Sequence, residues 1–140
     1  MHLLVFTLDD QYFGLPLSVV TQVTSAVEIT HLPHSPSQCI GAINLHGEIT
    51  PVFSMRRLLG LREKEIDLTD QFVICNLNKK IVGLWIDNAK SVSQFTKSAC
   101  TSGGELFPKA EALEHVIKND SQIILVYDIE RLLPLEVLKK

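Results

Sequence analysis

The run from Gly41 to Phe53 constrains the fold of this chain more than any other segment. It reads Gly-Ala-Ile-Asn-Leu-His-Gly-Glu-Ile-Thr-Pro-Val-Phe, which is two short strand-forming stretches around a turn signal. Strand-forming stretches separated by a short break that contains Gly are typical of a β-hairpin. An antiparallel pair of strands is therefore expected here, and the form of the turn decides which side chains face the core.

A three-residue loop from Leu45 to Gly47 separates polar from apolar side chains, whereas a two-residue loop at His46 and Gly47 mixes them on one face. Such a loop ends in a left-handed residue, a position that Gly47 suits. We therefore predict a bulged turn with His46 at its tip, in ordinary backbone angles and with an outward side chain. The predicted apolar face holds Ile43, Ile49, Pro51 and Phe53, and the polar face holds Asn44, Glu48, Thr50 and Ser54.

Length and composition favour one cytoplasmic domain, residues 1–140. Apolar residues make up 46% of the 140 residues, and a net charge of −3 without a basic block argues against nucleic acid as a partner. No apolar stretch reaches the roughly 18–20 residues of a membrane-spanning helix, and the N-terminus has no signal-peptide pattern. Cys39, Cys75 and Cys100 are an odd number of cysteines without paired spacing, which favours a reduced protein.

The remaining pattern predicts a mainly β fold of small barrels with a few short helices. Residues 99–108 are expected to be a loop, and residues 110–119 stay open between helix and strand. The two halves share an order of hairpin, returning strand and short helix, which is too weak to establish a repeat from sequence alone. Strands are expected over 4–8, 12–16, 19–24, 72–77, 80–87 and 122–127, with 92–95 continuing the second hairpin. Helical turns are expected after Pro16, over 55–59 between Ser54 and Gly60, and over 129–133 after Asp128, with a possible resumption over 135–140 beyond Pro134.

Four segments, taken in order, carry a family resemblance that spans nearly the whole chain. They lie within residues 4–23, 29–52, 82–92 and 123–133, and include Gly14-Leu15-Pro16, Asn44-Leu45-His46-Gly47, Gly83-Leu84-Trp85-Ile86-Asp87 and Tyr127-Asp128-Ile129. As an ordered set they resemble the CheW-like domain, the adaptor module of bacterial chemotaxis arrays. The resemblance implies two small five-stranded SH3-like β-barrels packed together as intertwined parts of a single CheW-like domain.

The resemblance also implies a function without catalysis, cofactor or metal. The chain is expected to couple the cytoplasmic tip of a chemoreceptor to a histidine kinase with a CheW-like regulatory domain. It would do so in the cytoplasm, at receptor arrays on the inner face of the membrane, without inserting into the membrane or binding nucleic acid, and self-association stays open. The residues expected to line the contact region are Val20, Gln22, Val23, Gly41, Asn44, His46 and Gly47.

Two departures from the family pattern concern this contact region. The family usually has Arg where this chain has His46, and Glu where it has Gln22, and those family residues can form an ion pair across the first barrel. Loss of both charges avoids the uncompensated charge that loss of one would leave. In addition, Ser54 replaces a usual Asp, and His115 stands where Gly is common.

A different class of function is a small cytoplasmic enzyme or metal-binding protein using Cys39 with His31, His34 and His46. A His-x-x-His pair near a Cys offers plausible zinc ligands. Pro33 and Pro36 exclude a regular helix that would present both histidines on one face. A Cys nucleophile would also need a base and an oxyanion hole, which the sequence does not indicate.

Overall fold

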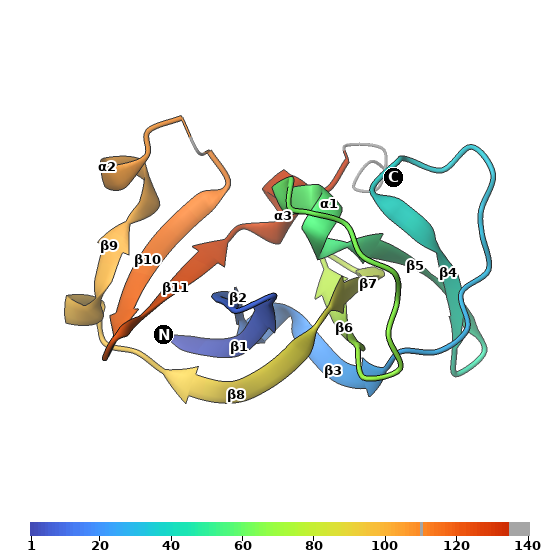
Figure 1. Cartoon of the computed structure of the whole chain (residues 1–140), viewed down its shortest axis with the longest axis horizontal. Coiled ribbons are helices and arrows are strands. Elements are labelled where there is room, and N and C mark those ends of the chain that lie inside the picture. Colours follow the sequence, from blue (N-terminus) through green and yellow to red (C-terminus); the bar gives the residue numbers. More distant parts are fainter. Residues whose placement is uncertain (110, 135–140) are drawn as a thin grey trace.

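The computed structural model describes residues 1–109 and 111–134, so the expected resumption of a helix over 135–140 lies outside the described residues. The described chain is mainly β with a few short helices, as predicted, and its strands form two mixed β-sheets (Figure 1). One sheet contains β1 (His2–Leu8), β2 (Gln11–Pro16), β8 (Asn88–Gln94), β9 (Cys100–Ser102), β10 (Leu113–Asn119) and β11 (Gln122–Tyr127). The other contains β3 (Val20–Ser25), β4 (Cys39–Leu45), β5 (Glu48–Ser54), β6 (Gln71–Leu77) and β7 (Lys80–Ile86).

The strand orders are β8-β1-β2-β11-β10-β9 in the six-stranded sheet and β3-β6-β7-β5-β4 in the five-stranded sheet. Most neighbours are antiparallel, but β11 with β2 and β5 with β7 are parallel. Other strands lie in sequence between the partners of each parallel pair, so neither pair is a simple strand–helix–strand unit. The first sheet thus has six strands where the family resemblance implied five.

Two of the short helices, α1 (Met55–Leu59) and α3 (Ile129–Leu132), begin where the sequence predicts; α1 also ends there, and α3 ends one residue earlier than predicted. Before α1, Ser54 Oγ accepts a hydrogen bond from the Arg57 N–H at 3.2 Å, and Gly60 closes the helix with φ 71°. Before α3, the Asp128 carboxylate accepts from the Glu130 N–H at 3.1 Å. These caps satisfy backbone donors that the first helical turn leaves free. The helical turn expected after Pro16 is a 3-10 turn, Leu17–Val19.

The turn between β4 and β5 differs from the predicted bulged form, because it is a two-residue loop. Leu45 pairs with Glu48, and both loop residues have positive φ, 52° at His46 and 88° at Gly47. Thus Gly47 is left-handed as predicted, but His46 does not have ordinary backbone angles. Two positive φ values match the right-handed twist of the flanking strands.

The prediction of the loop failed because it assigned faces by polarity alone. In the observed register Ile43 pairs with Thr50, which is buried, and the Thr50 hydroxyl lies 3.4 Å from the Glu48 carbonyl oxygen. A threonine whose hydroxyl is satisfied locally can occupy a buried face. Ile49, placed on the predicted apolar face, is 78% exposed.

A second hairpin, β6–β7, has the same kind of turn. Asn78 and Lys79 form its two-residue loop with φ 53° and 72°, and the Asn76 Oδ1 accepts from the Lys79 N–H at 2.9 Å. In the first hairpin Asn44 Oδ1 accepts from the Gly47 N–H at 2.8 Å. An Asn two residues before the loop therefore stabilises both turns.

The segment from 99 to 119 is more regular than predicted. The expected loop over 99–108 contains β9 and the short helix α2 (Gly103–Leu106). The ambiguous segment 110–119 contains β10, although its composition favours a helix. Pairing of β10 with both β9 and β11 overrides that local preference.

The two sheets repeat one plan. Val52 of β5 lies beside Gly83 of β7 in one parallel pair, and Val126 of β11 lies beside Gly14 of β2 in the other. A capped short helix follows both β5 and β11. Residues 39–52 thus correspond to 113–126, and the weak likeness between the two halves of the sequence is a structural repeat.

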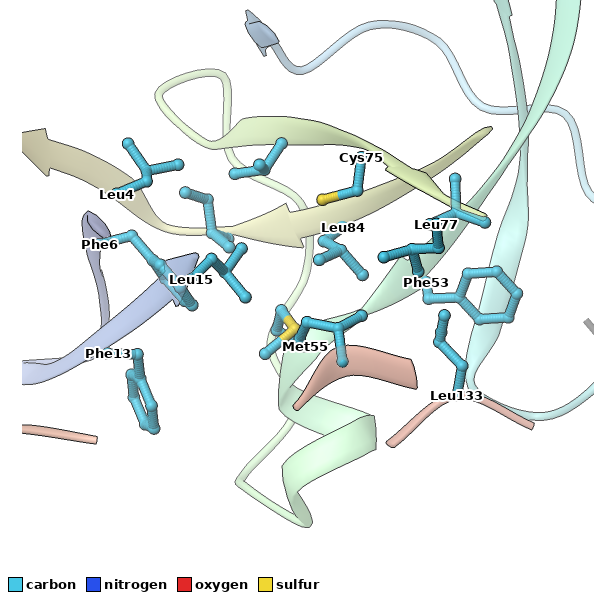
Figure 2. Close-up of a cluster of buried hydrophobic side chains, with 14 of the residues drawn as sticks. Leu4, Phe6, Phe13, Leu15, Phe53, Met55, Cys75, Leu77, Leu84 and Leu133 are labelled. Carbon is cyan, nitrogen blue, oxygen red and sulfur yellow. The ribbon is translucent and has the colours of Figure 1, made fainter. Parts of the chain in front are cut away.

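A shared hydrophobic core lies between the sheets. Figure 2 shows side chains from β1 and β2 facing side chains from β5, β6 and β7, with Leu133 beyond α3 completing the cluster. Two smaller clusters lie against one sheet each, around Ile117 and Ile124 in one and around Phe72 and Trp85 in the other. Since the main cluster draws on both sheets, separating the sheets would expose it to water.

Candidate partner-binding site

His46 sits at the exposed tip of the β4–β5 hairpin, as predicted. The two positive φ angles and the Asn44–Gly47 hydrogen bond fix the backbone of this tip. Asn44 and Gly47 therefore shape the turn, while the His46 side chain is the group it presents to solvent. A rigid turn that presents one polar ring suits recognition by another protein.

Gly41 has a structural role at the start of the same hairpin. Its φ is 140°, and a Cβ there would lie 2.4 Å from the Thr30 carbonyl oxygen. This close approach permits two backbone hydrogen bonds of 2.8 Å between Thr30 and Ala42. Gly41 is buried, so it supports the site through the backbone and does not offer a contact surface.

Val20, Gln22 and Val23 lie on β3, an edge strand of the five-stranded sheet. Val20 and Val23 are half-buried and pack partly against the shared core. Between Val20 and Gln22 the register is irregular, and the Thr21 hydroxyl donates to the Ile74 carbonyl oxygen at 3.1 Å. The strand therefore keeps one backbone edge free of neighbouring strands among the described residues.

The predicted residues fall into two groups on opposite edges of one sheet. Gln22 belongs to β3 at one edge and His46 follows β4 at the other. Among the described residues, neither side chain makes a hydrogen bond or ion pair with the other. His46 and Gln22, which stand where the family usually has Arg and Glu, thus form no hydrogen bond or ion pair with each other across this sheet.

Val92 was not among the residues predicted from the sequence. It lies on β8, an edge strand of the six-stranded sheet, and is 57% exposed. Val23 pairs with Val73, and Val92 pairs with Leu4, which places the two valines in equivalent positions of the structural repeat. The signal in the sequence is a common offset of 69 residues, from Gly14 to Gly83 and from Val23 to Val92.

The residues of the enzyme or metal alternative do not form a reactive cluster. Cys39 is buried, and its thiol donates to the Gly41 carbonyl oxygen at 3.4 Å. Burial raises the pKa of the Cys75 thiol to about 12, which keeps it protonated at neutral pH. In the part of the chain that the structure describes, no three His, Cys, Asp or Glu side chains are arranged to hold a metal ion.

A wide surface hollow of about 1050 Å³ lies between β10 and α3. Charged side chains of Glu111, Glu114, Glu130 and Arg131 line much of it. Neither Cys39 nor His31, His34 or His46 is part of this lining. The hollow therefore lends no support to the proposed Cys–His chemistry.

No helix among residues 1–109 and 111–134 has the length and apolar character needed to cross a membrane.

Comparisons with known proteins extend the likeness over nearly the whole chain. A family model described as the CheW-like domain matches residues 2–137. A probable chemotaxis protein CheW from Rhizobium etli is 24% identical over 133 residues, covering 94% of this chain and 86% of that protein. A chemotaxis protein CheW from Bacillus subtilis is 25% identical over 136 residues, covering 96% of this chain and 87% of that protein.

A solved structure has the same fold. The crystal structure of the scaffolding protein TtCheW from Thermoanaerobacter tengcongensis superposes with a TM-score of 0.82 at 23% sequence identity. The match covers 91% of this chain and 88% of that one. The arrangement of the two sheets is therefore shared at low sequence identity.

Proposed function

Because the chain belongs to the CheW-like domain family, we propose that it is a chemotaxis scaffold that acts by binding other proteins and catalyses no reaction. The observation that carries this function is the family match over residues 2–137, together with curated relatives named chemotaxis protein CheW. The buried Cys39 and Cys75 favour this class over a thiol enzyme.

The proposed partners are a histidine kinase with a CheW-like regulatory domain and the cytoplasmic tip of a chemoreceptor. Binding both would hold the chain in the cytoplasm, at receptor arrays on the inner membrane face. A net charge of −3 without a basic cluster supports protein partners over nucleic acid.

The proposed architecture is one CheW-like domain in which each sheet curls into a small SH3-like barrel. The Thr30–Ala42 bridge supports curling of the five-stranded sheet, because it ties the segment after β3 to the opposite edge strand β4. The core shared between the sheets supports a single domain.

The proposed contact surface comprises the His46 tip and the exposed parts of the edge strands β3 and β8. Gln22 and Val23 contribute from β3, and Val92 contributes from β8. In this proposal Gly41, Asn44 and Gly47 hold the hairpin in shape. Val20 and Val23 contribute with their exposed parts only, since both also pack against the core.

Pull-down with purified proteins tests this function. The chain is expected to bind a histidine kinase containing a CheW-like domain, and to bind a receptor tip, from the same organism. His46→Asp is expected to weaken at least one of these interactions about tenfold, roughly 1.4 kcal/mol, with a melting temperature within about 2 °C of the parent. Failure to bind any kinase or receptor tip of the organism would exclude the scaffold function.

The matched control is Asn78→Asp, which adds the same charge at the same position of the second two-residue turn. It is expected to leave binding unchanged. Equal weakening by both variants would assign the effect to net charge and not to the β4–β5 tip. A fall in melting temperature that matches the loss of binding would make His46 a structural residue.

A further inference from the structure

Each sheet is built from both halves of the chain. The N-terminal half (residues 1–60) supplies β1 to β5 and α1, and the C-terminal half (residues 71–134) supplies β6 to β11, α2 and α3. Four strand pairs join the halves: β1–β8, β2–β11, β3–β6 and β5–β7. In Figure 1, dark blue strands lie among yellow and red ones in one sheet, and pale blue and teal strands lie among green ones in the other.

Neither half can bury the main core by itself. Phe6, Phe13 and Phe53 come from the N-terminal half, and Leu77 and Leu84 come from the C-terminal half (Figure 2). The hairpins within each half would leave these side chains exposed without the other half. Folding of each half therefore depends on strands from the other.

The only covalent link between the halves is the connection over residues 61–70. Its two ends are held to both halves: Arg57 Nε pairs with Glu63 at 2.6 Å, the Trp85 indole N–H donates to Asp70 at 2.9 Å, and the Ala26 N–H donates to the Asp70 carbonyl oxygen at 3.0 Å. These contacts hold each end of the connection to a folded unit, and they can form whichever copy of the chain supplies the other half of that unit. A connection of this kind sets the effective concentration of one half around the other, on the order of millimolar for a short flexible chain.

We propose that two copies of this chain can exchange halves, so that the N-terminal half of each copy folds with the C-terminal half of the other. All four inter-half strand pairs and the shared core are then reproduced twice, and only the connections take a new path. Exchange is favoured when the chain folds at a concentration near the effective concentration of its own second half. Because the conversion of an exchanged dimer into two monomers requires the paired halves to separate, the dimer and the monomer interconvert only through unfolding.

Complementation between two damaged chains tests the proposal. Gly41→Val damages the N-terminal half, since even a Cβ there lies 2.4 Å from the Thr30 carbonyl oxygen. Gly103→Val damages the C-terminal half, where a Cβ would overlap the Leu113 carbonyl group. Each variant alone is expected to lack a cooperative melting transition. Unfolded together and refolded as a mixture, they are expected to regain up to half of the native signal, because one intact half of each forms a complete unit.

The control is a pair of variants damaged in the same half, Gly41→Val with Phe53→Asp, which no exchange can rescue. If either glycine variant folds alone, Phe53→Asp and Ile117→Asp replace the pair, since each introduces a charge at a fully buried position. No rescue by the cross-half pair, or equal rescue by the same-half pair, would overturn the proposal.

The parent chain provides a second measurement. Refolding it at increasing concentration is expected to raise the fraction of a species with twice the monomer mass, and removal of residues 65–69 is expected to raise it further. Mixing isotopically labelled and unlabelled dimers in native buffer is expected to give no hybrid by native mass spectrometry, and refolding them together is expected to give one. Only monomer under all these conditions, or rapid hybrid formation in native buffer, would contradict half exchange.

Discussion

Arg56 joins the two sheets through its guanidinium group. Although it lies on α1 of the N-terminal half, its Nη2 contacts Asp87 beyond β7 at 2.6 Å and Asp9 in the β1–β2 turn at 2.9 Å. Its Nη1 also donates to the Arg62 carbonyl oxygen at 3.0 Å, at the start of the connection. The Arg56 side chain is 3% exposed, so its charge depends on these partners for compensation.

Replacing Arg56 with Met is expected to lower the free energy of unfolding by about 3 kcal/mol, because it removes the nearest cation from Asp87 and leaves only Lys64, at 4.0 Å. Urea unfolding measures the change. Arg57→Met is the matched control on the same helix: its side chain is 38% exposed and its ion pair with Glu63 is on the surface, so a loss below about 1 kcal/mol is expected. Similar losses of unfolding free energy for the two variants would show that the Arg56 contacts between the sheets stabilise the protein no more than a surface ion pair does.

Asp70 ties the connection to the only tryptophan. Burial alone would raise its pKa, but hydrogen bonds from Lys64, the Asp67 N–H and the Trp85 indole N–H outweigh it and lower the pKa below the ordinary 3.8. A carboxylate with a lowered pKa in the folded state stabilises that state above its ordinary pKa. The stabilisation is lost as pH falls through the folded-state pKa.

Asp70→Asn is therefore expected to destabilise the protein by about 1–3 kcal/mol at pH 7, and the difference from the parent is expected to shrink as pH is lowered through 4 towards 2. Trp85 fluorescence during urea unfolding reports the transition. Asp67→Asn, at an exposed position of the same connection, serves as the control and is expected to have a small effect at both pH values. A difference for Asp70→Asn that does not depend on pH would contradict a role for its charge.

At the scale of single elements, local signals in the sequence were sufficient where a residue and its partner are close in the chain. Ser54, Gly60 and Asp128 cap their helices as predicted, since each cap needs only residues two or three positions away. The predicted three-residue loop of the β4–β5 hairpin is wrong, because the burial of Thr50 depends on packing against other strands. Local composition does not distinguish the strand β10 from a helix for the same reason.

The two glycines of the β4–β5 hairpin are expected to differ in their tolerance of a side chain. Gly47→Ala meets no atom within 4 Å and costs about 1 kcal/mol through its positive φ. Gly41→Ala is strained at φ 140° and also meets the Thr30 carbonyl group, so a loss of about 3 kcal/mol or more is expected. Thermal unfolding of both variants tests this, and equal losses would mean that the Thr30–Ala42 contact is not required.

At the scale of the whole molecule, the pairing of the halves could not be predicted from local patterns. Val5 pairs with Ser91 and Phe13 lies beside Leu125, and no turn or spacing in the sequence links such distant strands. The sequence shows the likeness of the two halves, but it does not show that their strands alternate within each sheet. The candidate site was affected in the same way, because the equivalence of Val92 with Val23 follows from the repeat and not from any motif near Val92.

The same interdependence predicts the behaviour of the chain cut within its connection. Fragments 1–65 and 66–140 are each expected to lack a cooperative transition, because neither can bury the shared core alone. Mixed together, they are expected to form a one-to-one complex in which Trp85 returns to its buried environment. A monomer stable by roughly 7 kcal/mol and an effective concentration near 1 mM correspond to a dissociation constant on the order of 10 nM for the fragments.

Titration of fragment 66–140 with fragment 1–65, followed by Trp85 emission, measures this constant. Fragment 1–65 carrying Phe53→Asp is the control, since a charge at that buried position should prevent association. If one fragment folded alone with native Trp85 emission, its half would hold an independent core. The inter-half strand pairs would then join two independently folded units. That result would contradict both the cooperative folding of the two halves and the proposed half exchange.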